Sequence, residues 1–449
     1  MDHLSEQYEH GAQSNAGKMA ELAYTDSLTG LFNRRYLEER LTRLVKERDE
    51  DPAPFAFGIL DLDGFKPIND LFGHAAGDDI LFQIGQRLKS CLPKTSIAAR
   101  LGGDEFAVLL PLVFNNRQAA VVGEAIRDVI SAPYDLDGRT VQVSSCIGLT
   151  LYPYGGRNST EILNSADSAL YRSKKQGRAA ITIYTDEIAK EMKRLTEIEQ
   201  ALRRAIKLNQ VRPYYQPVVE VETGSLKGFE ALARWTDSAL GAITPDMFIQ
   251  LAEDRGFIGT LSKSLLAQAA KFAANWSDDL FLSFNLSSAE LIDPTTALDV
   301  ISIINRAGLN PRRLELEITE TAIIADPDLA KENINNLRMA GIRVALDDFG
   351  TGQSSLARLR EFKFDKLKID RSFISNILDD PTTEHIVRAI VEMCRAMDIS
   401  VVAEGIEYKG QAEILANLGC QLGQGYYYGK AMHPDEIVQK SRLLNAASA

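Results

Sequence analysis

The sequence predicts two domains of different classes, an α+β domain followed by an α/β barrel of the (β/α)8 or TIM type. Three observations support this prediction. The chain has 449 residues, which is enough for two or three domains with separate cores. The first half has a few strand-like apolar runs with helical patterns between them. The second half repeats a short apolar run followed by a helix-like stretch, which is the rhythm of a (β/α)8 barrel.

The composition is that of a folded protein with an excess of acidic residues. Hydrophobic residues make up 45% of the chain, which is too many for extended disorder. There are 62 acidic and 50 basic side chains, and the formal charge of −12 disfavours binding to polymeric nucleic acid or to anionic lipid heads. A small anionic ligand held by local basic groups and metal ions is compatible with this charge.

The cysteine and histidine patterns argue against disulfides and zinc. Cys91, Cys146, Cys394 and Cys420 form no CxxC pair, so we expect reduced thiols in a cytoplasmic protein. The five histidines give no zinc spacing, so any metal should be a hard cation held by carboxylates. No apolar run reaches the roughly 18 residues of a membrane helix, and no signal peptide opens the chain. We expect no membrane segment here, although a sensor or an anchor could precede Met1 in a longer parent protein.

The first domain is predicted over residues 23–184, after a polar tail or incoming connector at residues 1–22. Its strand-like runs are Phe55–Leu60, Ser96–Leu101, Phe106–Leu110 and Val141–Leu151. Its helical patterns are Arg35–Lys46, Asp78–Lys89, Arg117–Ile130 and Ser159–Gln176. Few strands with interleaved helices predict an α+β sandwich.

A connecting helix is predicted over residues 185–210. Apolar side chains recur there in steps of three and four from Ile188 to Ile206, which is the pattern of one helix face. The second domain is predicted over residues 211–445.

Polar side chains end most of the apolar runs of the second domain. They are Glu230, Asn285, Glu317, Asp347, Asp348, Lys368, Glu404 and Gln424. In a (β/α)8 barrel the active site lies at the carboxyl ends of the strands, so these groups should converge. Because so many carboxylates would repel each other, their cluster predicts bound divalent cations.

A second acidic site is predicted in the first domain. The segment Arg100–Leu110 reads RLGGDEFAVLL, and Gly102 and Gly103 mark a hairpin tip where the backbone can approach a phosphate. Asp104 follows the glycines, and Asp61 ends an apolar strand upstream. Two carboxylates on adjacent strands are a suitable site for Mg²⁺ with substrate phosphates.

The first domain resembles the GGDEF, or diguanylate cyclase, domain. Besides RLGGDEF, the resemblance includes DSLTGLFNRR at residues 26–35, DLDGFKPINDLFGHAAG at 61–77 and KKQGR at 174–178. It implies a ferredoxin-like fold related to nucleotide cyclases. It also implies a reaction in which two such domains, each holding one GTP, meet and join the two GTP molecules. A homodimer is therefore expected.

The resemblance also implies roles for individual residues of the first domain. Asp61, the carbonyl of Leu62 and Asp104 would hold one or two Mg²⁺ or Mn²⁺ ions with GTP, and Asp104 would help to remove the hydroxyl proton. Asn69 and Asp78 would bind guanine. The groups near the phosphates would be Lys66, Gly102, Gly103, Lys174 and Arg178. One departure is the window Pro93–Ser96, which lacks the RxxD motif of product inhibition, so we expect no inhibition through that site.

The second domain resembles the EAL domain of cyclic di-GMP phosphodiesterases. The matching blocks are YQP at 215–217, FEALARW at 229–235, NLS at 285–287, EITE at 317–320, DDFGTG at 347–352, DKLKID at 365–370, EGIE at 404–407 and QGY at 424–426. The resemblance implies hydrolysis with two Mg²⁺ or Mn²⁺ ions.

The residues to which the resemblance assigns roles include the polar residues that end the apolar runs of the second domain. Glu230, Asn285, Glu317 and Asp347 would bind the first metal, and Asp347 and Asp348 would share the second. Lys368 and Glu404 would position or activate water, and Gln424 would orient the site. Glu320 would anchor the DDFGTG loop, and Gln216 and Arg234 would contact substrate. Glu315 and Glu407 are expected to be structural or exposed.

Three functional hypotheses follow, all with GTP and cyclic di-GMP as the small-molecule partners. In the first, the barrel hydrolyses cyclic di-GMP to linear pGpG while the first domain binds GTP and synthesises cyclic di-GMP. In the second, the first domain is only a GTP sensor that activates the barrel. In the third, the chain is a non-catalytic receptor for cyclic di-GMP.

Overall fold

The chain forms two compact units that divide between Arg194 and Leu195. The computed structural model describes residues 23–50, 53–136, 138–349 and 356–437. Helix α7 (Asp186–Lys207) crosses the division. Its later part belongs to the second unit, where Ile198 and Leu202 are buried in that unit's core.

The first unit is built on a sheet of six described strands in the order β1-β3-β4-β2-β7-β8. Only the outer pairs β1–β3 and β7–β8 are parallel among these strands. Their bounds are β1 (Phe32–Asn33), β2 (Phe55–Asp63), β3 (Ile97–Gly102), β4 (Glu105–Leu110), β7 (Ser144–Tyr152) and β8 (Ile181–Ile183), and β5 (Tyr134–Leu136) and β6 (Arg139–Val141) form a separate hairpin.

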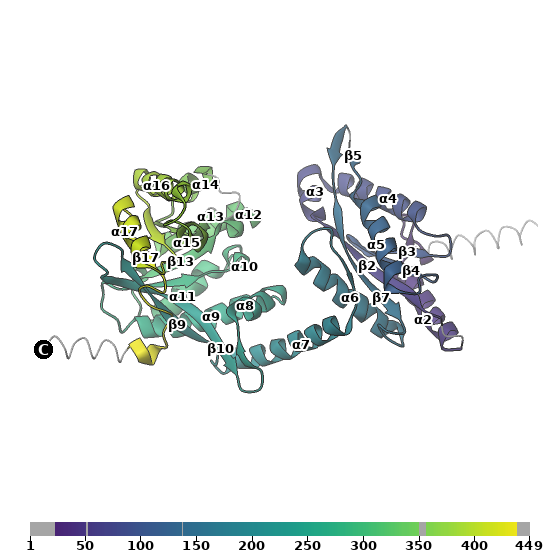
Figure 1. Cartoon of the computed structure of the whole chain (residues 1–449), viewed down its shortest axis with the longest axis horizontal. Helices are drawn as coiled ribbons and strands as arrows, with labels where there is room; N and C mark the ends of the chain where they lie inside the picture. The colour runs from purple at the N-terminus through teal and green to yellow at the C-terminus, as the bar shows by residue number, and fades with distance from the viewer. Residues whose placement is uncertain (1–22, 51–52, 137, 350–355, 438–449) are drawn as a thin grey trace, which may run out of the picture. The chain divides into compact units, whose positions relative to one another are not determined.

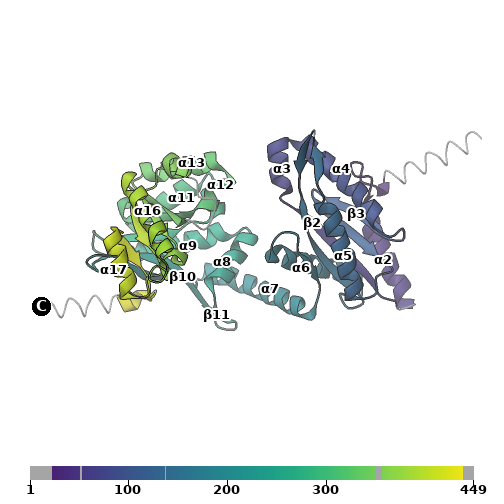
Figure 2. The same cartoon turned by 45° about the horizontal axis from the view of Figure 1, so that its top comes forward.

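Helices cover both faces of this sheet (Figures 1 and 2). Along β2, Phe55 and Phe57 pack on one face against α2 (Arg34–Glu50) and α6 (Ser159–Gln176). Ala56 and Leu60 pack on the other against α4 (His74–Cys91) and α5 (Asn116–Ser131). Side chains alternate along a strand, so a strand covered on both sides reads as a continuous apolar run. The predicted α+β class is confirmed.

Five described elements of the first unit were not predicted: the short strands β1 and β8, the strands β5 and β6 of the hairpin, and helix α3 (Phe65–Phe72). Each is short, so its apolar periodicity is weak.

Close packing explains one glycine of this unit. A Cβ at Gly148 of β7 would overlap the backbone of α6 at Ala166 and Leu170, so only glycine lets this helix approach the sheet.

The second unit is a closed barrel of eight described strands with helices outside it (Figure 1). The strand order is β10-β12-β13-β14-β15-β16-β17-β9, and β9 also pairs with β10. Their bounds are β9 (Arg212–Glu220), β10 (Leu226–Asp237), β12 (Phe281–Asn285), β13 (Leu314–Thr319), β14 (Arg343–Phe349), β15 (Lys366–Ile369), β16 (Ser400–Ala403) and β17 (Leu422–Gln424).

One strand departs from a uniformly parallel barrel. The neighbours from β10 to β17 pair in parallel, whereas β9 is antiparallel to both β10 and β17. A short strand, β11 (Gly241–Ile243), pairs with the end of β10. The predicted TIM-type class is confirmed, with this one reversed strand as a feature that the sequence pattern did not indicate.

Several helices of the barrel begin at a residue whose side chain caps the helix. Asp326 accepts a hydrogen bond from Leu329 N ahead of α13, and Asp380 caps α16 in the same way. The described helices are α8 (Pro245–Asp254), α9 (Ile258–Ala273), α10 (Ser288–Leu291), α11 (Thr296–Ala307), α12 (Glu320–Ala325), α13 (Pro327–Met339), α14 (Leu356–Phe362), α15 (Arg371–Ser375), α16 (Pro381–Ala396), α17 (Lys409–Leu418) and the 3-10 turn η1 (Pro311–Arg313).

The barrel interior has an apolar layer made by Val218, Phe281 and Val402. Polar residues of neighbouring strands are buried as well, among them Glu315 and Lys366. In the described part of the chain, no helix combines the length and the apolar character that crossing a lipid bilayer requires.

Candidate functional site

The strand-end residues of the barrel converge around one lysine. Lys368 Nζ on β15 lies 2.7 Å from Glu317 Oε2, 2.6 Å from Glu404 Oε1, 3.4 Å from Asp347 Oδ2 and 3.7 Å from Glu230 Oε2. The lysine and all four carboxylate residues come from different strands or strand ends. One ammonium group therefore stands among four carboxylates, as the parallel strand arrangement predicts.

Amide side chains hold Glu230 in place. Asn285 Nδ2 donates to Glu230 Oε1 at 2.7 Å, and Gln424 Nε2 donates to Glu230 Oε2 at 2.6 Å. Gln424 Nε2 also lies 3.2 Å from Gln216 Oε1, and Gln216 donates to the carbonyl of Gly429. Glu230 is thus fixed by neighbours from β12 and β17, and Gln216 belongs to the same network.

Burial and mutual charge set the protonation of this cluster. Burial opposes the ionisation of Glu230, but Lys368 and the amide donors outweigh it and lower the pKa of that carboxyl. Burial and then the Glu230 charge raise the pKa of Glu317 well above its ordinary value. Burial opposes the charge on Lys368, but Glu230 and Glu317 outweigh it and raise the pKa of that ammonium well above its ordinary value.

The pKa of Glu404 is raised as well. Burial raises its pKa to about 7, although Lys368 opposes the change and Asp347 adds to it. A carboxyl group with this pKa exchanges its proton near neutral pH, as a general base requires.

A cavity of about 310 Å³ opens over the cluster. Its lining includes Glu230, Asn285, Asp347, Lys368 and Glu404, whereas Glu317 is not among the lining residues. The rim adds Tyr426 and the ion pair between Arg371 and Glu407, whose closest atoms are 2.7 Å apart.

The donor set suits hard divalent cations. It consists of carboxylate and amide oxygens with a surplus of negative charge over the single lysine. Gln424 Oε1 is buried and without a hydrogen-bond partner, which shows that the polar groups of the site are not fully satisfied by one another. Within the described ranges, no three acidic, histidine or cysteine side chains are gathered as a ready-made metal site, and the Lys368 ammonium lies between the carboxylates.

Two of the predicted residues lie away from this arrangement. Asp348 has a backbone φ of 55°, a conformation that costs energy for a residue other than glycine, and it is not among the residues lining the cavity. Burial, Asp347 and Asp370 raise its pKa. Glu320 is buried at the start of α12, but residues 350–352 of the loop that it was predicted to anchor lie outside the described residues.

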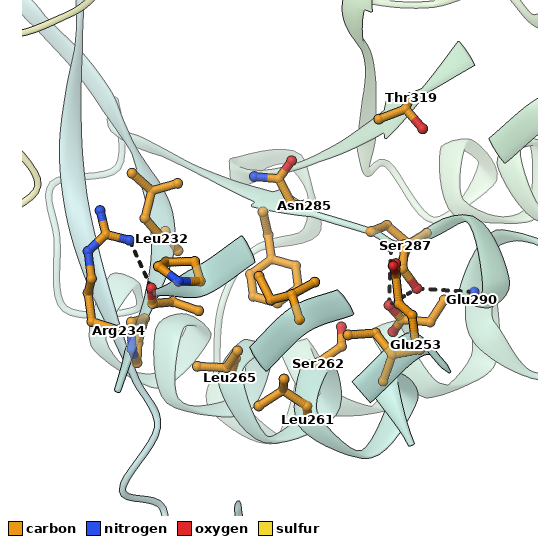
Figure 3. Close-up of a pocket in the computed structure, with 18 residues that line it drawn as sticks. Leu232, Arg234, Glu253, Leu261, Ser262, Leu265, Asn285, Ser287, Glu290 and Thr319 are labelled. Carbon is orange, nitrogen blue, oxygen red and sulfur yellow. Dashed lines mark hydrogen bonds between the residues drawn. The ribbon is translucent and has the colours of Figure 1, made fainter. Parts of the chain in front are cut away.

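A second, mainly apolar cavity of about 260 Å³ adjoins the first, because Leu232 and Asn285 line both. Figure 3 shows this cavity, with Arg234 at one side and the hydrogen-bonded Ser287 and Glu290 at the other. The predicted substrate contact Arg234 belongs to this cavity, whereas Gln216 lines the first one.

A second group of buried polar residues in the barrel was not predicted. We call this group, Ser283, Glu315 and Lys366, the lower tier. Glu315 was expected to be either structural or exposed. It is 1% exposed and paired with the buried Lys366, so it is structural. Ser283 on β12 lies between Glu315 and Glu317. A signal was present, because Glu315 and Glu317 are two residues apart on one strand, as are Lys366 and Lys368 on another, and such pairs share a strand face.

In the first unit, Asp61 and Asp104 lie at neighbouring strand ends. Asp61 of β2 is paired in register with Glu105, the residue after Asp104. Lys174 Nζ lies 2.7 Å from Asp61 Oδ2. Burial raises the pKa of Asp61, Lys174 opposes the change and the nearby Asp104 charge adds to it.

The predicted phosphate loop is a tight turn. Gly102 and Gly103 have φ values of 149° and 54°, and the Arg100 guanidinium donates to the carbonyl of Gly103 at 2.8 and 3.0 Å. Arg100 also pairs with Asp26 of the DSLTG block. These contacts were not predicted, and they fix the backbone of the turn.

The predicted guanine-binding residues are close together. A Cβ at Gly77 would overlap Asn69 Oδ1, so the first turn of α4 passes directly against Asn69 of α3. Asp78 follows Gly77 on α4 and is exposed. Lys66 on α3 and Arg178 after α6 are also exposed, so both are free to reach a ligand phosphate.

Comparison with known proteins gives two family matches. Residues 23–180 match the diguanylate cyclase, GGDEF domain, and residues 199–431 match the EAL domain. The chain is 38% identical over 423 residues to an uncharacterized signaling protein of Caulobacter vibrioides, covering 94% of this chain and 52% of that protein.

Two further similarities involve proteins with described activities. The chain is 34% identical to the bifunctional diguanylate cyclase/cyclic di-GMP phosphodiesterase MucR of Pseudomonas aeruginosa, covering 94% of this chain and 62% of MucR. It resembles the solved PaMucR phosphodiesterase in complex with c-di-GMP, with a TM-score of 0.52 and 34% identity, over 54% of this chain and 99% of that one. The chain thus spans between half and two thirds of the length of these two curated relatives.

Proposed function

This chain belongs to the family of proteins in which a GGDEF domain is followed by an EAL domain, and on that premise we propose that its barrel hydrolyses cyclic di-GMP to linear pGpG. The observation that carries the proposal is the convergence of Glu230, Glu317, Asp347 and Glu404 on Lys368 beneath an open cavity. We assign residues 23–184 to the GGDEF domain, 185–210 to the connecting helix and 211–445 to the EAL domain.

Mg²⁺ or Mn²⁺ is the cofactor that these oxygen donors would take. Glu230, Asn285, Glu317 and Asp347 would hold the first ion, and Asp347 with Asp348 the second. Bound divalent cations would neutralise the phosphodiester and acidify a water molecule. The unfilled acceptor of Gln424 and the excess of carboxylates over lysine support this assignment.

The proton in this reaction would be handled by Glu404. Attack of water on the phosphorus forms a P–O bond and breaks the bond to the 3′-oxygen, which takes up a proton from solvent in the open cavity. Glu404, whose pKa is about 7, can accept the proton of the attacking water, and Lys368 at 2.6 Å holds its carboxylate in place.

The adjoining cavity would receive a guanine base. It is mainly apolar, and Leu232 and Asn285 connect it to the carboxylate cavity, so one dinucleotide can occupy both. Arg234 at its side would bind a phosphate oxygen, and Gln216 would contact the substrate from the first cavity.

The first domain would bind GTP with one or two metal ions at Asp61, the carbonyl of Leu62, and Asp104. Asn69 and Asp78 would hold guanine, and the turn at Gly102 and Gly103 would approach the phosphates with Lys66, Lys174 and Arg178. One chain offers one such site, so synthesis needs two chains as a homodimer. Each 3′-hydroxyl then attacks the α-phosphate of the other GTP, Asp104 accepts the hydroxyl proton and pyrophosphate leaves.

A GTP sensor is the second candidate for the first domain. The ion pair between Lys174 and Asp61 supports it, because GTP phosphates and a metal would compete for both partners and so change the site on binding. Product analysis separates the candidates. The purified chain is incubated with Mg²⁺ or Mn²⁺ and either GTP or cyclic di-GMP, and the nucleotides are separated by chromatography.

We expect pGpG from cyclic di-GMP. Cyclic di-GMP or pGpG formed from GTP alone would eliminate the sensor-only version. Binding of cyclic di-GMP without turnover under either metal would instead identify a receptor.

A further inference from the structure

A buried serine lies between the two carboxylates of β13. Ser283 Oγ is 2.6 Å from Glu317 Oε1 and 3.4 Å from Glu315 Oε1. Ser283, Glu315 and Glu317 are each no more than 2% exposed. Water therefore does not compete for these contacts, and a buried acceptor that loses its donor is left unsatisfied.

The serine hydroxyl has one hydrogen and can donate it to one carboxylate only. The oxygen of Glu315 that Ser283 could reach, Oε1, already accepts a hydrogen bond from Lys366 Nζ at 2.7 Å. The shorter contact of the hydroxyl is with Glu317. Because Lys366 donates to Glu315 Oε1, the hydrogen of Ser283 is available for Glu317.

The two oxygens of Glu317 therefore have different partners. Oε1 accepts from Ser283 below, and Oε2 accepts from Lys368, which lines the cavity. A carboxylate held at one oxygen presents the other in a fixed direction. Outer-sphere partners of this kind orient metal-binding carboxylates and affect metal affinity.

We propose that Ser283 is a positioning residue of the barrel site, whose hydroxyl fixes Glu317 so that its second oxygen faces the divalent cation. This inference rests on the proposed function, since it assumes that Glu317 binds the metal. Lys366 supports the arrangement from the lower tier, where its ammonium also lies 3.9 Å from the centre of the Phe281 ring.

The test is a Mn²⁺ titration of the full chain by calorimetry, made without substrate. Ser283→Ala removes the donor. Ser283→Cys nearly keeps the volume but offers only a weak donor, and its thiol is a poor ligand for a hard cation. Ser283→Thr restores the hydroxyl. Val218→Ala is the matched control, because it truncates a side chain in the apolar layer of the barrel interior and removes no hydrogen-bond donor.

We expect the Mn²⁺ dissociation constant to rise about 10- to 100-fold in the Ala and Cys variants. It should return to near the wild-type value in Ser283→Thr and stay there in Val218→Ala. In activity assays, higher Mn²⁺ should restore kcat of Ser283→Ala, with KM for cyclic di-GMP unchanged. Thermal unfolding of each variant shows that it is folded.

A Mn²⁺ affinity unchanged in both Ser283→Ala and Ser283→Cys would overturn the inference, as would an equal loss in Val218→Ala. Failure of the proposed function looks different. In that case the wild-type chain would bind Mn²⁺ but release no pGpG, and the titration of the serine variants would still decide the role of Ser283.

Discussion

The ammonium of Lys368 donates to Glu317 Oε2 at 2.7 Å, and both side chains are almost completely buried. Lys368 is therefore the local counter-charge of a site with four carboxylates, three of which face the cavity with it. A divalent cation that enters the site would share this task with the lysine.

Glu230→Ala should abolish hydrolysis of cyclic di-GMP and leave GTP binding unchanged. The carboxylate is held by Asn285 and Gln424, so its loss removes a fixed oxygen pair from the proposed metal site. We expect a loss of about 1,000-fold or more in kcat, or about 4 kcal/mol of transition-state stabilisation. The measurement is pGpG release, with the exposed Glu332→Ala on α13 as the control. Retention of more than about a tenth of the activity would contradict the role of Glu230.

Asp104→Asn should abolish synthesis of cyclic di-GMP from GTP without changing hydrolysis. The substitution removes the negative charge that lies beside Asp61 and that the metal would neutralise. Pyrophosphate release with GTP measures the effect, and Asp128→Asn, which is exposed on α5, is the matched control. Full synthesis by Asp104→Asn would rule out the metal assignment in the first domain.

Product inhibition of synthesis through the RxxD site should be absent, because residues 93–96 lack that motif. The measurement is pyrophosphate release by the Glu230→Ala variant, in which cyclic di-GMP accumulates. We expect the rate to stay constant as product builds up and on addition of further cyclic di-GMP. A progressive fall in the rate with substrate still in excess would refute this expectation.

Lys368→Met should destabilise the metal-free barrel. Removing one partner of a buried ion pair leaves its carboxylates uncompensated, which typically costs about 3–5 kcal/mol. Mn²⁺ should recover part of this stability, because it binds the folded state and supplies the missing positive charge. Thermal unfolding with EDTA and with Mn²⁺ measures both effects, and the exposed Lys409→Met is the control. An unfolding temperature equal to that of the wild type in EDTA would show that Lys368 is not the counter-charge.

Metal-free protein should gain stability through Glu404 as the pH falls from about 7 toward 4.5. The folded state raises the pKa of this carboxyl to about 7 from an ordinary value of 4.5, so in this range it binds a proton that the unfolded chain does not. Glu404→Gln should weaken this dependence, by an amount on the order of 1 kcal/mol or more between the ends of the range. Unfolding measured across pH in EDTA tests it, with the exposed Glu413→Gln as control. An unchanged pH dependence in Glu404→Gln would exclude the shift.

The strand pattern of the barrel could be predicted because its polar residues mark the strand ends. Of the predicted strand-end residues, Asn285 ends β12 and Glu404 directly follows β16, whereas Glu230 lies inside the longer β10. The reversed direction of β9 could not be predicted, because alternation of apolar residues is the same in parallel and antiparallel strands.

The site could be predicted in part. The carboxylates around Lys368 were identified from their places at strand ends, whereas Ser283 was not, since a serine inside an apolar strand carries no signal of its own. Its importance appears only when β12 and β13 are placed side by side. In the first unit, the hydrogen bond from Arg100 to the Gly103 carbonyl depends on the hairpin geometry, so it could not be predicted from the sequence either.

The reversed direction of β9 has a consequence for where the polypeptide enters the barrel. Arg212 at the beginning of β9 lies in register with Arg234, and Gln216 lies in register with Glu230. In a uniformly parallel barrel the incoming segment would arrive at the opposite end. Here it arrives four residues before Gln216, at the end of the barrel where Gln216 lies beside Glu230, so a displacement of the backbone ahead of Arg212 would reach the strand that carries Gln216 first.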